Sequence, residues 1–218
     1  MSGTKPDTLI EVEPDKMNDS STDITTIDIL RHGELEGGDI FRGSTDDALT
    51  DKGWQQMVSA LGDKNKWDII ITSPLSSCRE FAEVIAQDEE IDLEINKQLT
   101  EIDFGHWEDQ TLEDIVKENA DLLNAWWQSP TQITPPNGED FHDIRSRVLK
   151  AFKEIRSEYK GKNILIVTHS GVIRLLLMNI LGMQDENLFR LNVDYASFSK
   201  VQIENSEAGE RGILVEHR

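Results

Sequence analysis

The sequence has a single cysteine, Cys78, among 218 residues, which excludes an internal disulfide and a metal site built from several thiolates of this chain. Positive charge is also scarce, because 22 lysines and arginines stand against 42 acidic residues and leave a net charge of −20. Proteins that bind nucleic acids or anionic membranes usually carry an excess of Lys and Arg, so neither is expected as a general partner of this chain. No apolar run approaches the roughly 20 residues of a membrane span, and no secretory signal is evident. We therefore predict a soluble cytoplasmic protein.

Residues 1–26 differ from the rest of the chain. They hold six acidic residues, two lysines and one small apolar cluster, Leu9, Ile10 and Val12. Such a segment cannot bury enough surface to offset the entropy of ordering, so it is predicted to be a flexible acidic tail. A docking segment for a partner is the alternative. Residues 27–218 are predicted to form one domain.

Strand-like and helix-like patterns alternate along that domain. Strands are predicted at 27–30, 67–72, 93–99, 163–168, 198–203 and 212–215. Helices are predicted to begin after Thr50, at Leu75, at Thr111, after Asp140 and at Val172, the last ending at Gly182. This order predicts an α/β fold, a three-layer sandwich with a mostly parallel central sheet. Ligands bind beyond the carboxyl ends of such strands, which singles out residues 31–33, 73–74 and 169–171.

Two histidines, His32 and His169, each follow an apolar strand and lie next to or near a glycine. Imidazole is a competent nucleophile at neutral pH when a backbone carbonyl holds one nitrogen and the other is free. Arg31 offers a fork for phosphate oxygens, and a second histidine, protonated near a dianion, stabilises charge on a transferring phosphoryl group. The alternative is a pair of ordinary histidines at strand ends.

Phosphoryl transfer to a histidine also needs a carboxylic acid that protonates the leaving alcohol. Glu101 is the candidate, because it follows a predicted strand and is flanked by Ile102, Phe104 and Trp107, which are expected to be buried. The opposing interpretation is that Glu101 is one ordinary acid among 42.

Residues 30–34 read Leu-Arg-His-Gly-Glu, and this motif resembles the signature of the histidine phosphatase superfamily. Further segments are similar to the family in order and spacing: 41–43, 46–53, 73–75, 101–108, 136–139 and 167–174. The resemblance covers residues 27–203. It implies a phosphoglycerate mutase-like fold and a phosphomonoesterase that needs neither a metal nor an organic cofactor.

The resemblance also implies a role for each matching residue. His32 would be the nucleophile that forms a phosphohistidine, and Glu101 would be the general acid and then the base that activates water. His169 would complete the catalytic set and line the phosphate pocket. The substrate-binding residues that the resemblance implies are Arg31, Arg42, Gly43 and Ser170.

Within the superfamily, four segments resemble the α-ribazole phosphatase branch. They read FRGSTDDALT at 41–50, SPLSSCREFA at 73–82, EIDFGHWE at 101–108 and LFRLNVDYAS at 188–197. This implies a small phosphorylated metabolite as the substrate, with α-ribazole 5′-phosphate of cobalamin biosynthesis as the candidate. The sequence leaves open whether the chain is a monomer or a homodimer.

One position departs from the family pattern. The family places a second phosphate-binding arginine two residues after the leucine of Ser-Pro-Leu, and Ser77 stands there. Arg79 lies about 200° further around the helix and should point elsewhere. Another cation, Arg42 or Arg174, could fill the gap, the enzyme could be weakened, or the protein could bind a phosphorylated ligand without turnover. The three retained catalytic residues favour an active or weakened phosphatase.

Three smaller features complete the predictions. The pair Trp126-Trp127 could stack on an α-ribazole-like base, or belong to a helix core or a subunit contact. Cys78 is predicted to be inert core. No metal site is predicted, because the remaining histidines show no metal-ligand spacing with His32 or His169; they are His106, His142 and His217.

Overall fold

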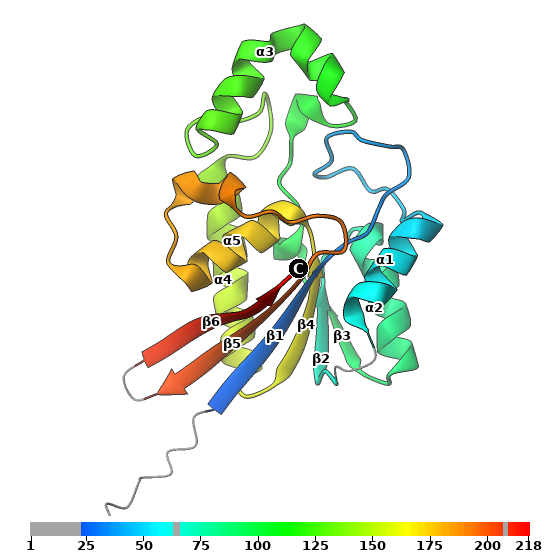
Figure 1. The fold of residues 1–218 in the computed structure, drawn as a ribbon, viewed down its shortest axis with the longest axis vertical. Helices are drawn as coiled ribbons and strands as arrows, with labels where there is room; N and C mark the ends of the chain where they lie inside the picture. The colour runs from blue at the N-terminus through cyan, green and yellow to red at the C-terminus, as the bar shows by residue number, and fades with distance from the viewer. Residues whose placement is uncertain (1–22, 63–65, 207–208) are drawn as a thin grey trace, which may run out of the picture.

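The computed structural model describes residues 23–62, 66–206 and 209–218, so most of the predicted tail lies outside the described residues. A six-stranded sheet runs through the domain in the order β3-β2-β4-β1-β5-β6 (Figure 1). The strands are β1 (Asp23–Arg31), β2 (Ile69–Thr72), β3 (Asp92–Ile95), β4 (Asn163–Thr168), β5 (Phe198–Ser206) and β6 (Gly209–His217). β3, β2, β4 and β1 are parallel, while β5 and β6 are antiparallel to their neighbours. The predicted α/β fold with a mostly parallel central sheet is confirmed.

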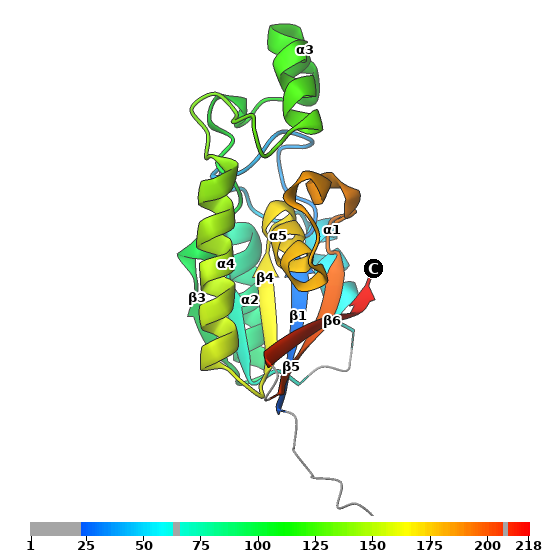
Figure 2. The same cartoon turned by 90° about the vertical axis from the view of Figure 1, so that its left-hand side faces the viewer.

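Helices cover both faces of this sheet (Figure 2). They are α1 (Asp51–Leu61), α2 (Ser76–Asp88), α3 (Leu112–Gln128), α4 (Phe141–Glu158) and α5 (Ser170–Leu181), with short 3-10 helices η1 (Lys97–Leu99), η2 (Gly105–Trp107) and η3 (Asp185–Arg190). The predicted helix boundaries at Thr50, Asp140 and Gly182 are confirmed. The Thr50 and Asp140 side chains accept amide hydrogen bonds at the starts of α1 and α4, and Gly182 ends α5 in the left-handed conformation at φ 62°.

The apolar residues of β4 explain the three layers. Ile164 and Ile166 pack against α4 and α5, while Leu165 and Val167 pack against α1 and α2. Successive side chains of a strand point to opposite faces, so a strand that is apolar throughout must be covered on both sides. β4 is therefore the central strand of the fold.

Several strand boundaries differ from the predictions: β2 begins two residues later, β5 and β6 are longer, and β1 and β3 differ for a visible local reason. β1 begins at Asp23 rather than at residue 27, because residues 23–26 pair with β5 in an antiparallel ladder. The strand predicted at 93–99 ends at Ile95, because the Asn96 side chain accepts a hydrogen bond from the Gln98 amide and starts η1. Backbone pairing and a local cap, rather than hydrophobicity, set these two boundaries.

Helix α3 lies beyond the carboxyl ends of the parallel strands, apart from the two helical layers (Figure 1). It leaves helical geometry at Asn119, where the chain kinks. Its buried side chains pack with Trp107 in a separate cluster, and Phe41 and Phe104 lie against that cluster. α3 is thus a cap held to two loops at the edge where ligands bind. No helix in the described part of the chain is long and apolar enough to cross a membrane.

Candidate active site

The two predicted histidines meet at the carboxyl edge of the sheet. β1 and β4 are parallel neighbours with Arg31 opposite Thr168, so the residues that follow them also lie side by side. The His32 amide donates to the Thr168 carbonyl at 3.1 Å, and the His32 and His169 ring centroids are 5.2 Å apart. The register of this strand pair therefore brings together two imidazoles that are far apart in the sequence.

The ring of His32 is held in one tautomer. Its Nδ1 lies 2.8 Å from the Gly33 carbonyl oxygen, which can only accept, so Nδ1 carries the hydrogen and Nε2 keeps its lone pair. The side chain is 6% exposed. Burial, followed by the proximity of His169 and Arg31, lowers the pKa of His32 to about 3. The ring is neutral at pH 7 and Nε2 is available as a nucleophile.

His169 lies deeper and is 3% exposed. Its Nε2 is 2.8 Å from Ser73 Oγ and 3.7 Å from the buried Cys78 sulfur. Burial, followed by the charges of Arg31 and Arg147, lowers the pKa of His169 to about 3. The ring is therefore neutral at pH 7, and the protonated second histidine of the sequence-based prediction requires the negative charge of a bound phosphate.

Arg31 lies beside this histidine pair. Its Nη1 donates to the Val193 carbonyl at 2.7 Å, and its guanidinium lies 4.4 Å from the centre of the Tyr195 ring. Nε of Arg31 is buried and has no hydrogen-bond partner among the described residues. Tyr195 also lies against His32, with ring centroids 5.8 Å apart. Sequence reasoning missed Tyr195, whose only signal was its place in the segment 188–197.

Glu101 reaches the start of helix α5 and is 7% exposed. Its Oε2 accepts hydrogen bonds from the Gly171 amide at 2.8 Å and from the Ser170 hydroxyl at 3.1 Å. A Cβ atom at position 171 would lie 2.4 Å from Oε1 of Glu101, so this approach requires glycine. The helix N-terminus favours negative charge and fixes the carboxylate. Ser170, predicted to bind substrate, thus also holds Glu101.

Arg147 of α4 fixes the backbone that carries Glu101. Its guanidinium donates to the carbonyl oxygens of Gln98, Thr100 and Glu101 at 2.7, 2.8 and 3.0 Å. It also forms a two-point ion pair with Glu139, at 2.6 and 2.8 Å. Sequence reasoning missed Arg147, because nothing local distinguishes it from other helical arginines.

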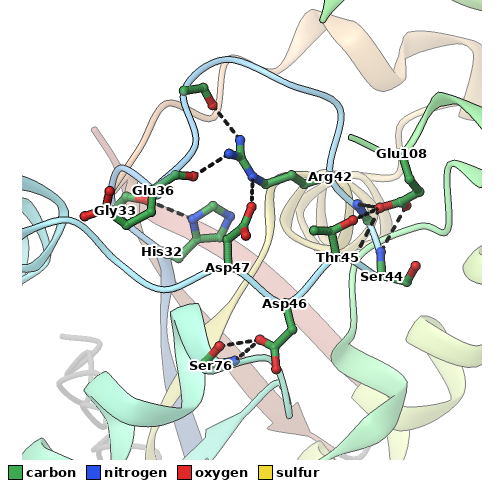
Figure 3. A network of polar contacts seen from close by, with 12 residues as sticks. His32, Gly33, Glu36, Arg42, Ser44, Thr45, Asp46, Asp47, Ser76 and Glu108 are labelled. Carbon is green, nitrogen blue, oxygen red and sulfur yellow. Dashed lines mark hydrogen bonds and ion pairs between the residues drawn. The ribbon is translucent and has the colours of Figure 1, made fainter. Parts of the chain in front are cut away.

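The Arg42 side chain binds other residues of the loop in which it lies (Figure 3). Its Nε forms an ion pair with Asp47 at 2.5 Å, and its terminal nitrogens donate to the carbonyl oxygens of Glu36 and Gly38 at 2.5 and 2.7 Å. Arg42 lines the cleft beside His32, as the prediction of a substrate-binding role requires. Its charge is nevertheless largely committed to Asp47.

Gly43 follows Arg42 and lies against the loop that carries Glu101. Its amide donates to Glu108 Oε2 at 3.1 Å, and a Cβ atom at this position would collide with the Ile102 carbonyl oxygen. The Glu108 carboxylate also accepts from Ser44 and Thr45 (Figure 3). Burial raises the pKa of Glu108, but these hydrogen bonds outweigh it, so the net pKa is lowered. Gly43 thus joins two loops, and sequence reasoning missed the role of Glu108.

Ser77 lies in the first turn of α2 and is 3% exposed. Its hydroxyl is 3.9 Å from the Cys78 sulfur, and that sulfur contacts the His169 ring. At the same helix end Asp46 accepts a hydrogen bond from the Ser76 amide at 2.6 Å (Figure 3). Position 77, where the family pattern has a guanidinium, thus carries no charge, and the Asp46 carboxylate lies at the same helix end.

Two cavities adjoin at this site. The first, of about 230 Å³, is a cleft lined by Arg31, His32, Leu35, Ile40, Phe41, Arg42, Glu101, Phe104, Ser170 and Tyr195. The second, of about 190 Å³, is lined by Phe41, Glu101, Ile102, Phe104, Trp126, Trp127, Phe141, Ile144, Ser170, Gly171, Arg174, Leu175, Leu188 and Phe189. Arg174 thus lies in the second cavity rather than beside His32. The described residues contain no cluster of three potential metal ligands.

Comparison with known proteins places this geometry in a family. The model of the histidine phosphatase superfamily (branch 1) matches residues 27–212. A bifunctional protein of Mycobacterium tuberculosis is 33% identical over 180 residues, which are 80% of this chain and 49% of that protein. The chain therefore spans about half the length of this relative.

Two relatives match over most of their length. The adenosylcobalamin/alpha-ribazole phosphatase of Escherichia coli is 28% identical over 179 residues, covering 80% of this chain and 88% of that protein. The crystal structure of the alpha-ribazole phosphatase from Shigella flexneri aligns with a TM-score of 0.74 at 29% identity. That alignment covers 87% of this chain and 95% of the other.

Proposed function

This chain belongs to the histidine phosphatase superfamily, and we propose that it is a phosphatase that dephosphorylates a small metabolite through a phosphohistidine at His32. The observation that carries the proposal is the state of the His32 ring. Its Nδ1 donates to a carbonyl and its Nε2 is free, beside the cleft and 5.2 Å from a second imidazole. This arrangement is what nucleophilic catalysis by a neutral histidine needs.

In the first step, His32 Nε2 attacks the phosphorus of the monoester, and the bond between phosphorus and the alcohol oxygen breaks. Glu101, protonated beside the negative charge of the bound monoester, donates its proton to that oxygen as the alcohol leaves. In the second step, the Glu101 carboxylate takes a proton from water, and the water oxygen attacks the phosphohistidine. The bond between phosphorus and Nε2 breaks, so inorganic phosphate, neutral His32 and protonated Glu101 are restored.

Arg31 and His169 supply the positive charge for both steps. Arg31 lines the cleft, so its guanidinium is the proposed donor to a phosphate oxygen, and a bound dianion favours protonation of the adjacent His169. Position 77 adds no charge, Arg42 is paired with Asp47, and Arg174 lines the other cavity. Catalysis is therefore proposed to be weaker than in a site with two guanidinium groups.

α-Ribazole 5′-phosphate is the proposed substrate. Support comes from the relatives named as alpha-ribazole phosphatases and from the aromatic cavity next to the cleft. The proposed setting is the cytoplasm, in cobalamin biosynthesis. Binding of a phosphorylated ligand without turnover is the second candidate function, and the serine at position 77 is the observation that favours it.

Hydrolysis of p-nitrophenyl phosphate by the wild-type chain and by His32→Ala tests the proposal. The wild type is expected to hydrolyse the ester and to trap covalent phosphate, and His32→Ala is expected to lose both. His142→Ala, at an exposed position of α4, is the matched control. Undiminished hydrolysis by His32→Ala would refute the phosphohistidine. Tight binding of inorganic phosphate by a wild-type chain without turnover would establish the second candidate.

A further inference from the structure

Tyr195 lies against two groups of the proposed active site, the Arg31 guanidinium and the His32 ring. The centre of the Tyr195 ring is 4.4 Å from the central carbon of the guanidinium and 5.8 Å from the centre of the imidazole. Arg31 also donates from Nη1 to the Val193 carbonyl at 2.7 Å, and it has no ion pair within the described residues. One hydrogen bond and one aromatic ring therefore hold this guanidinium.

A turn of the backbone places the Tyr195 ring beside these two groups. The Ala196 amide donates to the His32 carbonyl at 3.0 Å, and the Arg31 amide donates to the Ser197 carbonyl at 2.9 Å. Ala196 has a φ of 55°, in the left-handed region that residues other than glycine rarely adopt. The turn is thus bound to the backbone of Arg31 and His32, so the ring stays within reach of the guanidinium.

Core packing does not explain an aromatic residue at this position. The other tyrosine of the chain, Tyr159, packs against a core cluster, whereas Tyr195 belongs to none of the three clusters of the described residues. Its ring lies between the phosphate cleft and a polar cavity of about 490 Å³, and it is the one described residue that lines both. Its hydroxyl forms no hydrogen bond within the described residues. The ring itself therefore makes the contacts of this side chain with Arg31 and His32.

The orientation of Arg31 matters more here than in a site with two free arginines. Position 77 carries a serine, and the Arg42 guanidinium forms an ion pair with Asp47. Recognition of phosphate by the remaining guanidinium depends on where its N–H groups point, and these groups lie in one plane. A guanidinium that stacks on an aromatic face keeps the N–H groups in that plane free to donate. Tyr195 can therefore fix the orientation of Arg31 without using up its donors.

We propose that Tyr195 is a positioning residue that holds the Arg31 guanidinium at the phosphate cleft through the face of its ring. The inference rests on the proposed binding of a phosphate group beside His32, and it adds a residue that acts through Arg31 and not on the substrate. The competing role for Tyr195 is a direct hydrogen bond from its hydroxyl to the phosphate. The two roles differ in whether the ring or the hydroxyl is needed.

Calorimetric binding of inorganic phosphate to the full chain measures the effect without turnover. Tyr195→Phe keeps the ring and is expected to bind phosphate within about twofold of the wild type, whereas Tyr195→Leu is expected to weaken binding by about threefold to thirtyfold, the range of a cation–π contact. Tyr195 is half-exposed, so the fold should tolerate both changes. Tyr159→Leu is the matched control, because the Tyr159 hydroxyl donates to Glu94 and the residue lines neither cavity beside Tyr195. It should bind phosphate as the wild type does.

A double-mutant cycle with Arg31→Gln shows whether Tyr195 acts through Arg31. Glutamine removes the cation, so nothing remains for the ring to hold. Adding Tyr195→Leu to Arg31→Gln is therefore expected to change phosphate binding, followed by nuclear magnetic resonance titration, by less than about twofold. A further loss as large as that in the wild-type background would show that the ring only supports the fold, and it would overturn the inference.

The Nε–H resonance of Arg31 in isotope-labelled protein reports the position of the guanidinium without any ligand. The ring is expected to shift this resonance upfield in the wild type and in Tyr195→Phe, and the shift is expected to disappear in Tyr195→Leu. The same resonance position in all three proteins would overturn the inference. Weakened phosphate binding in Tyr195→Phe would also overturn it, because the hydroxyl would then be the group that matters.

Hydrolysis of p-nitrophenyl phosphate by the same variants separates this inference from the proposed function. If the wild type binds phosphate but hydrolyses no ester, and Tyr195→Leu still weakens binding, the phosphatase proposal fails and the positioning role stands. If Tyr195→Leu matches the wild type in both phosphate binding and kcat/KM, the positioning role fails and the phosphatase proposal stands.

Discussion

Replacing Ser77 with arginine is expected to raise kcat/KM for phosphomonoester hydrolysis by about 10²- to 10³-fold, the range that one charge-stabilising donor contributes at a transition state. Ser77 lies in the first turn of α2, and its neighbour Cys78 contacts the His169 ring. A guanidinium at this position would therefore be one side chain away from the His169 imidazole, which lies beside the proposed nucleophile His32. Arg31 is otherwise the one guanidinium beside His32 that has no ion-pair partner within the described residues.

The magnitude follows from the local charges. Two unit charges about 4 Å apart interact by about 4 kcal/mol at an effective dielectric constant of 20, and a dianion strengthens this attraction. Repulsion between the new guanidinium and Arg31 opposes it. Asp46, which accepts from the Ser76 amide, supplies a counter-charge at the same helix end. A net gain of about 3 kcal/mol in transition-state stabilisation corresponds to the expected rate increase.

The same substitution is expected to cost stability. Ser77 is 3% exposed, and forcing a longer side chain into such a position costs about 1–3 kcal/mol. Thermal unfolding should therefore show a lower midpoint while activity rises. A lower unfolding midpoint together with a higher kcat/KM is the result expected when the substitution restores a functional charge.

Steady-state kinetics on p-nitrophenyl phosphate, with two matched variants, provide the assay. Ser77→Met adds bulk without charge and is expected to give no gain, while Ser77→Lys adds a charge without the bidentate fork and is expected to give an intermediate gain. Equal activity of Ser77→Arg and Ser77→Met in folded protein would show that position 77 does not face the phosphate. The electrostatic reasoning would then be wrong.

Three further predictions concern the surroundings of the site. Asp46→Asn keeps an acceptor for the start of α2 but removes a negative charge, so phosphate inhibition measured at low salt should tighten a few-fold. Gly171→Ala places a methyl group against the Glu101 carboxylate, so kcat for ethyl phosphate should fall at least about tenfold. The kcat/KM for 2,4-dinitrophenyl phosphate, which reports phosphoryl transfer to His32 and whose leaving group needs no acid, should hardly change, and an equal loss of kcat/KM on both esters would contradict the role of Glu101 as the acid. Burial lowers the pKa of His169 from its ordinary value of 6.5, which applies in the unfolded chain, to about 3 in the native state. As the pH falls between these two values, the unfolded chain binds a proton that the native state does not, so the free energy of unfolding decreases. Urea titrations should show a smaller loss in His169→Gln, and an unchanged pH profile would refute the buried neutral ring.

Features set by neighbouring residues could be read from the sequence. The caps at Thr50 and Asp140 depend on contacts within one helical turn, so the residue type at one position predicts them. The pairing of His32 with His169 was predictable for a different reason. Both follow apolar strands, and the carboxyl ends of parallel strands share one edge of the sheet.

Features set by distant contacts could not be read in this way. Arg147 reaches Glu101 across 46 positions of sequence, and Glu108 reaches the loop at Gly43 across 65. Nothing in the local pattern marks Arg147, because any helical arginine has similar neighbours in sequence. The segment 101–108 includes Glu108, but it does not show which backbone amides the Glu108 carboxylate accepts from. Arg42 shows the converse. Its motif predicts substrate contact, but an acid five positions away, Asp47, takes up its charge.

The pairing of charges fits the proposed binding of an anionic substrate by so acidic a chain. Acidic residues neutralise the arginines that build the site, as Asp47 does for Arg42 and Glu139 does for Arg147. Two arginines in the cavity walls, Arg31 and Arg174, have no ion pair within the described residues, and each lines a different cavity. Glu101 lines both cavities. A general acid must touch the one oxygen that joins phosphorus to the alcohol, so the boundary between the cavities is where that oxygen has to lie. In the proposed reaction the phosphate therefore lies on the side of Arg31 and the alcohol part of the ester on the side of Arg174, with the Glu101 carboxylate between them.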